Sequence, residues 1–157
     1  MSSSPSQLSR MYASIVEERL GVMATVDGDD DVVFKYPELG TVLILVQAAR
    51  DPEVLQIIFP YFLAPAEIGL DAVRFLDAVN RVNVQVKGAK VVFDAARGRA
   101  SVSVEAVLAA PDEVPERELV AAVLERMMSM VHHAVRLLVK TCREVADVQG
   151  SRNMALN

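Results

Sequence analysis

The chain has 157 residues and a net charge of -5 at neutral pH; 52% of its residues are hydrophobic and only 5% are aromatic. This length suits a single domain whose core needs neither a metal nor a disulfide. The pI near 5.0 and the lack of a basic stripe argue against a nucleic-acid partner, because phosphate binding depends on clustered Lys and Arg.

The N-terminal third predicts a short tail, a helix and a hairpin. Residues 1–6 are small, polar and proline-punctuated, which is typical of a disordered tail. A helix follows, and Gly21 can close it with a left-handed cap. Its apolar side chains recur at spacings of three and four: Leu8, Met11, Tyr12 and Ile15. Val22–Val26 and Val32–Tyr36 flank the turn sequence DGDDD and predict a hairpin.

Two strongly apolar strands come next, at Thr41–Gln47 and Val54–Phe59. Both are apolar on their two faces, so we expect cover above and below them. Pro60 cannot donate to a ladder hydrogen bond. We therefore expect it to end the second strand or to place that strand at an edge.

A second helix, a second hairpin and a long closing helix complete the pattern. Ala66–Asn83 has helical periodicity, and Lys90–Asp94 and Arg99–Leu108 form a hairpin with one polar face. Asp112 is the predicted N-cap of a final helix of about thirty residues, well above the mean of about 11–12. Its apolar positions step by four and three: Val120, Leu124, Met127, Val131, Ala134, Leu138 and Cys142.

The element order therefore predicts an α+β fold, with a mainly antiparallel sheet and helices packed on it, in the order α-β-β-β-β-α-β-β-α. We predict one domain over residues 7–148 and a C-terminal tail over residues 149–157.

Two asparagines, Asn80 and Asn83, stand where the second helix gives way to the hairpin. Helical spacing places them on one line with Val73 and Leu76, which we expect to face the core. Their amides can bond free carbonyls of the helix end or the incoming strand, so we interpret the pair as a structural junction. The alternative is that they recognise a ligand.

Sites for chemistry are weakly indicated. Asp27, Asp29, Asp31 and Glu38 occupy calcium-loop positions, but the glycine that such a loop needs at its sixth position is replaced by Val32, so a solvated turn is expected.

His132 and His133 are adjacent on a helix, so their side chains diverge and cannot chelate one ion. Cys142 shares the apolar stripe and is expected to be a core residue. No catalytic motif is found, so we predict no enzyme activity, no metal and no cofactor.

Met127, Met128 and Met130 form a cluster that wraps the last helix. Thioethers fill irregular cores and also make adaptable binding surfaces, so the cluster is either core filling or a partner-binding surface.

The segment NRVN, followed by KGAKVVFDAARGRASVSVEAVL, resembles the YbjN family, in which a helix ending in two asparagines leads into a hairpin and a long closing helix. The resemblance covers about residues 7–145. It implies a fold similar to type III secretion chaperones, which are small, acidic, usually dimeric proteins that bind an unfolded segment of an effector. It implies no catalytic residues.

The aliphatic surplus leads us to expect a non-enzymatic homodimer that acts as a chaperone, adaptor or regulator and binds an extended or helical segment of another protein. The lone cysteine and the polar start indicate a cytoplasmic protein, and no apolar run is long enough to predict a membrane span. The alternative is a small-molecule-binding regulatory domain, with a pocket between sheet and helix lined by Phe75, Val79 and Asn80.

Overall fold

The computed structural model describes residues 5–155, with side-chain surroundings through residue 148. Three helices, one 3-10 turn and six strands follow one another along this part of the chain. In order they are α1 (Gln7–Leu20), β1 (Ala24–Val26), β2 (Val32–Tyr36), β3 (Gly40–Leu45), β4 (Val54–Leu63), η1 (Pro65–Ile68), α2 (Ala72–Gln85), β5 (Ala89–Asp94), β6 (Arg99–Val107) and α3 (Arg117–Ala155). The predicted α+β class and element order are confirmed.

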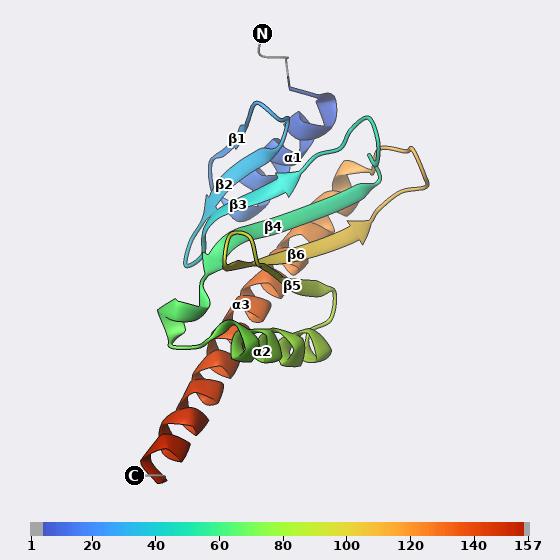
Figure 1. The fold of residues 1–157 in the computed structure, drawn as a ribbon. Helices are drawn as coiled ribbons and strands as arrows, with labels where there is room; N and C mark the ends of the chain where they lie inside the picture. Colours follow the sequence, from blue (N-terminus) through green and yellow to red (C-terminus); the bar gives the residue numbers. More distant parts are fainter. Residues whose placement is uncertain (1–4, 156–157) are drawn as a thin grey trace.

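The six strands form one sheet in the order β1-β2-β3-β4-β6-β5, and each neighbouring pair is antiparallel. The antiparallel sheet is therefore as predicted. Figure 1 shows α1 and α3 on the same side of the sheet, and α2 packs against both α3 and β5 on that side. The helices thus form one layer and the sheet forms the other.

The covered face of the sheet holds the core. Alternate residues of the strands point toward the helices and are almost fully buried, among them Ile44, Ile57 and Val102. The predicted apolar stripe of α3 is also correct, because every one of its seven positions is buried. Phe75 of α2 joins this core through an edge-on contact with Phe93, with ring centroids 5.3 Å apart.

Helix ends follow their capping chemistry, which corrects two predicted boundaries. α1 is closed by Gly21 at φ 66°, as expected. The helix expected from Ala66 begins instead at Ala72, because Gly69, at φ 71°, ends the short η1 turn and Asp71 caps α2 by accepting from Arg74 N. Asp112 is not the cap of α3: it has φ 64° and lies in the loop before Arg117.

Pro60 neither ends β4 nor lies at an edge, contrary to the prediction. β4 continues to Leu63 between β3 and β6, and its pairing with β6 shifts register between Phe59 and Leu63. Tyr61, at φ 47°, lies inside this irregularity, and its N–H donates to Ser101 Oγ at 2.9 Å. A bulge is one of the few places where a sheet tolerates proline, because no ladder hydrogen bond is required there.

The two predicted tails are partly described. Residues 1–4 and 156–157 lie outside the described residues. Ser6 caps α1 by accepting from Ser9 N, and its own N–H donates to Asp30 Oδ1 at 2.8 Å. At the other end α3 runs on to Ala155, so the predicted tail at 149–157 is helical through that residue. No proline interrupts the sequence after Arg117, which lets the helix continue.

Candidate functional site

The face of the sheet opposite the helices is uncovered, and much of it is apolar. Figure 1 is viewed toward this face, and none of the described helices lies over it. We define the open-face patch as five half-buried aliphatic residues of β2, β3 and β4: Val33, Leu43, Leu45, Val54 and Ile58. The prediction that the apolar strands are covered above and below is therefore met on one side of the sheet only.

A polar strip borders the open-face patch across β4, β6 and β5. Gln56 Nε2 donates to Glu105 Oε1 at 2.9 Å, and Lys90 Nζ lies 3.2 Å from Glu105 Oε2. Ser103 beside them is 8% exposed, so the predicted polar face of the second hairpin is correct but partly shielded. Beyond the strip Val92 is 52% exposed. The open face thus combines an aliphatic area with a fixed, charged border.

Asn83 and Asn80 have different surroundings. Asn83 Nδ2 donates to Val91 O at 2.9 Å, and Val91 N donates to Asn83 Oδ1 at 2.8 Å. Because β5 is the last strand of the sheet, this amide satisfies the outward backbone groups of Val91 as a further strand would. Asn80 is exposed, and no hydrogen bond joins its side chain to a described residue.

The line predicted to carry both asparagines toward the core is wrong. Val73 is 78% exposed and Leu76 is 43% exposed. The buried side of α2 is instead formed by Phe75, Ala78, Val79 and Val82. Hydrophobic periodicity allowed either set of residues to face inward, and packing against α3 and β5 selects the second.

The edge of the sheet at the end of β6 is open. The pairing of β5 with β6 stops at Ala89 and Val104, whereas β6 continues beside β4 to Val107. Residues 105–107 therefore have no partner from β5. Such an edge can accept an added strand from another chain.

A small apolar hollow of about 340 Å³, which we call the methionine groove, lies beside this open edge. Met127 and Met130 line it together with Ala106, Ala122, Val123 and Arg126. Gly88 forms part of its rim, where a Cβ would lie only 3.1 Å from Met130 Sδ and where φ is 75°, so both space and backbone favour glycine.

The methionine cluster is thereby divided. Met128 is 1% exposed and does not line the groove, so it fills the core. Met127 is 3% exposed and forms the floor of the groove, whereas Met130 is half-buried at its side. Met128 therefore fills the core, while Met127 and Met130 remain candidates for the predicted partner-binding surface.

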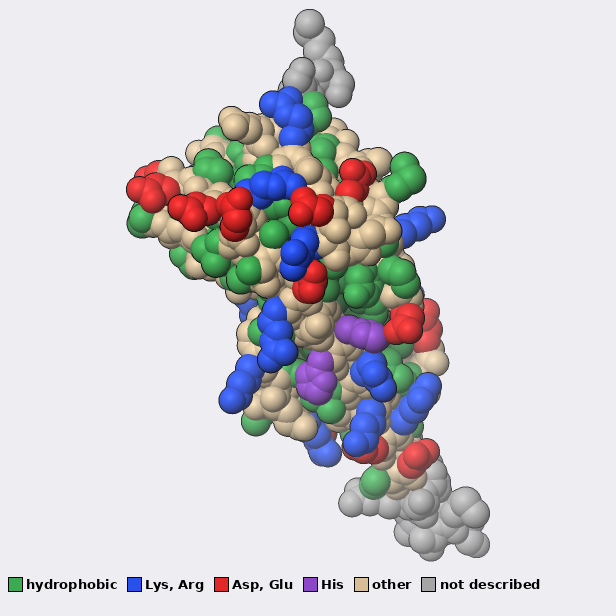
Figure 2. Space-filling model, turned by 180° about the vertical axis from the view of Figure 1, so that it is seen from behind, with side chains coloured by type: hydrophobic (Ala, Val, Ile, Leu, Met, Phe, Trp, Pro, Cys, Tyr) green, Lys and Arg blue, Asp and Glu red, His purple; other side chains and the backbone are tan. Residues whose placement is uncertain are grey.

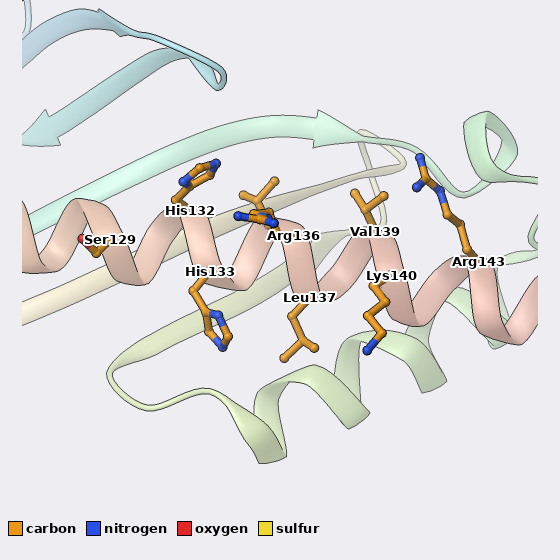
Figure 3. A pocket seen from close by; sticks show the side chains of 9 residues that line it. Ser129, His132, His133, Arg136, Leu137, Val139, Lys140 and Arg143 are labelled. Carbon is orange, nitrogen blue, oxygen red and sulfur yellow. The ribbon is translucent and has the colours of Figure 1, made fainter.

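Two further depressions continue the methionine groove along α3. The next, of about 450 Å³, shares Arg126 and Met130 with the groove, and the third, of about 840 Å³, shares Ser129 and His133 with the second. The third depression is lined by α3 alone, so it is an open surface (Figure 3). Together they make one continuous track that leads from the open edge of β6 along α3.

The outer part of this track is positively charged. Its cations are Lys87, Arg126, Arg136, Lys140 and Arg143. Figure 2 shows Lys and Arg side chains around the two histidines on the helix side of the molecule. We call this surface the cationic face. Glu105 is the single acid among the described residues that line the track, and Lys90 already pairs with it.

The side chains of the cationic face fan out from one helix. In Figure 3 His133 and Lys140 point toward the side on which α2 lies, and His132 and Arg143 point the opposite way, with Arg136 between them. Arg136 and Lys140 are four residues apart and carry like charge, which costs a helix about 0.2–0.5 kcal/mol per pair. Lys140 Nζ lies 3.8 Å from Glu144 Oε1, whereas no carboxylate among the described residues forms a salt bridge with Arg126 or Arg136.

Sequence reasoning missed the cationic face because it looked for a basic cluster along the chain. The signal was present: Arg136, Lys140 and Arg143 recur at four and three, on the side of α3 opposite the apolar stripe. Arg126 and Lys87 join them only in three dimensions.

The acidic turn and the histidines have structural contacts. Asp27 Oδ1 accepts from Asp29 N and Asp31 N, and Asp31 Oδ1 accepts from Val46 N. His132 Nε2 lies 3.3 Å from Glu38 Oε2. Among the described residues, no three His, Cys, Asp or Glu side chains are grouped so that they could hold a metal ion.

Cys142 is fully buried, and burial raises the pKa of its thiol to about 11. A protonated thiol in the core is a poor nucleophile. It packs as the hydrophobic residue that the periodicity of α3 predicts.

The position considered for a small-molecule pocket is filled. Phe75 is 0% exposed and Val79 is 4% exposed, and Phe75 packs against Phe93. Asn80 points away from this core and is exposed. The three residues therefore do not converge on one cavity.

No protein-family model, curated protein or solved structure matches the chain. None of the described helices is both long and apolar enough to cross a membrane.

Proposed function

We propose that this chain is a non-enzymatic protein-interaction domain that forms a homodimer and acts as a chaperone, adaptor or regulator in the cytoplasm. The open-face patch carries the proposal, because it places five aliphatic side chains on a sheet face that no described helix covers. Apolar areas of this kind on a soluble domain mark interaction surfaces.

A second copy of the chain fits this surface well. In a two-fold interface the same patch meets itself, so aliphatic side chains pack on aliphatic side chains. The strip formed by Gln56, Lys90 and Glu105 would lie at the border of the contact, where polar groups set the register of the two sheets. Burial of about 800 Å² per partner is ordinary for such an interface.

The methionine groove supports the chaperone or adaptor role. It lies beside the unpaired end of β6, so an extended segment of another protein could add to that edge and place an apolar side chain against Met127 and Met130. The resemblance of NRVN and its hairpin to the YbjN family supports the same class of function. The groove shares no residue with the open-face patch, although Glu105 of the bordering strip also lines the groove.

The interface is tested by placing a charge in the middle of the patch. Ile58→Lys buries a lysine between two copies, so we expect a monomer where the wild-type chain is a dimer, measured by light scattering during size-exclusion chromatography. The matched control is Val73→Lys on the outer side of α2, a residue that is 78% exposed and far from the patch. It should leave the dimer intact.

Two outcomes contradict this interface. One is a dimer that persists in Ile58→Lys, and the other is a dimer that is lost equally in Val73→Lys. Circular dichroism of both variants separates loss of association from loss of folding, since Ile58 is only half-buried in a single copy.

A further inference from the structure

We infer that the track along α3 binds an acidic segment of about ten residues that carries an apolar anchor at one end. The inference deepens the proposed function and rests on its claim that the chain binds segments of other proteins. It names the chemistry of the segment, which the groove alone leaves open.

The first argument is the charge of the track. The chain as a whole has a net charge of -5, yet the lining of the track contains Lys87, Arg126, Arg136, Lys140 and Arg143 against the single, already paired acid Glu105. A cationic surface on an acidic protein attracts anionic partners locally and steers their approach.

The second argument is the cost of keeping the charges together. Arg136 lies one helical turn from Lys140, and like charges at this spacing repel. Lys140 Nζ also lies 3.8 Å from Glu144 Oε1, which offsets part of this repulsion. Among the described residues, no carboxylate forms a salt bridge with Arg126 or Arg136. An acidic segment laid along the helix would remove this repulsion.

The third argument is the order of the parts. The apolar methionine groove lies at one end of the track and the cations Arg136, Lys140 and Arg143 lie toward the other. From Val123 to Arg143 the helix rises about 30 Å at about 1.5 Å per residue. An extended segment covers that length with about nine or ten residues. The segment therefore begins with an apolar anchor beside Met130 and continues with acidic residues.

The test uses a synthetic peptide as probe: a fluorescein-labelled chain of two leucines followed by alternating glutamate and serine, about ten residues long, and the same composition in reverse order. Anisotropy titrations compare each with a neutral version in which glutamine replaces glutamate. We expect one acidic order to bind at least about tenfold more tightly than its neutral version, and added salt to weaken it.

Variants locate the binding. Arg136→Glu should weaken the acidic peptide by about tenfold or more, whereas the matched Arg50→Glu, on a side chain that is 82% exposed in a distant loop, should not change it. Ala122→Trp fills the methionine groove from an exposed position and should weaken the acidic and neutral peptides alike.

The outcomes separate this inference from the proposed function. If the neutral peptide binds as tightly as the acidic one and Ala122→Trp abolishes both, segment binding stands and the acidic preference is overturned. If a single-stranded oligothymidine of similar length competes as well as the acidic peptide, the surface is a general polyanion site and the inference is also overturned. If neither peptide order binds, the inference and the segment-binding part of the proposed function both fail.

Discussion

The two faces of the sheet are made by alternate residues of the same strands, yet they have different surroundings. Ile57 points toward the helices and is 0% exposed, while its neighbour Ile58 belongs to the half-buried open-face patch. Both are isoleucines in the middle of β4. Residue type alone therefore does not decide how much a strand residue contributes to stability. That contribution depends on whether helices pack against its side of the sheet.

The comparison shows which face of the sheet is available for an interaction outside the single chain. The covered face is satisfied within one chain, because α1, α2 and α3 bury it. The open face carries the five aliphatic residues of the open-face patch, and no described helix covers it. The covered face therefore stabilises the fold, and association is what we propose for the open face.

The largest expected effect is a difference in stability between a substitution on the covered face and one on the open face. Ile57→Ala should lower the free energy of unfolding by about 2–5 kcal/mol, since it leaves a cavity in the core. Ile58→Ala should cost about 1 kcal/mol or less in the single chain. Urea denaturation at a protein concentration low enough to dissociate a dimer measures both values. Equal losses of unfolding free energy in the two variants would contradict the difference between the two faces.

A smaller effect is expected where the helix layer meets the edge of the sheet. Asn83→Ala removes both hydrogen bonds to Val91 and should lower stability by about 1–2 kcal/mol. Asn80→Ala, on the same helix and exposed, should change it by less than about 0.5 kcal/mol. Thermal or urea denaturation distinguishes them, and similar losses in the two variants would refute the edge-pairing role of Asn83.

The smallest expected effect is a gain in stability from a substitution on the covered side of the sheet. Tyr12 is 0% exposed, and its hydroxyl has no hydrogen-bond partner among the described residues. Burial raises the pKa of Tyr12 to about 12. Because a buried, unsatisfied hydroxyl is costly, Tyr12→Phe should raise the free energy of unfolding by about 1 kcal/mol. A loss of stability would show that the hydroxyl has a partner in solution.

Much of the fold could be predicted from the sequence because its periodicities are clear. The stripe from Val120 to Cys142 is buried as the spacing of four and three indicates. The ends of helices were harder to predict. Asp112 is a residue type that often caps helices, but its φ of 64° places it in the loop before α3. Pro60 was misjudged because a bulge, which depends on how β4 meets β6, removes the need for its missing N–H.

The candidate site could be predicted only in part. Met127 and Met130 were identified from composition, but their separation from Met128 depends on how α3 rotates against the sheet. The open end of β6 depends on the different lengths of β5 and β6, which sequence patterns do not fix to within a residue. The cationic face combines Lys87 with residues of α3, and this contact is tertiary.

The most direct test of the account is the mass of the wild-type chain in solution. Sedimentation velocity at micromolar concentrations should give a species of twice the 17.1 kDa of one chain, because we propose that two copies bury the open-face patch between them. A single species of 17.1 kDa throughout that range would contradict the assignment of the open face to self-association.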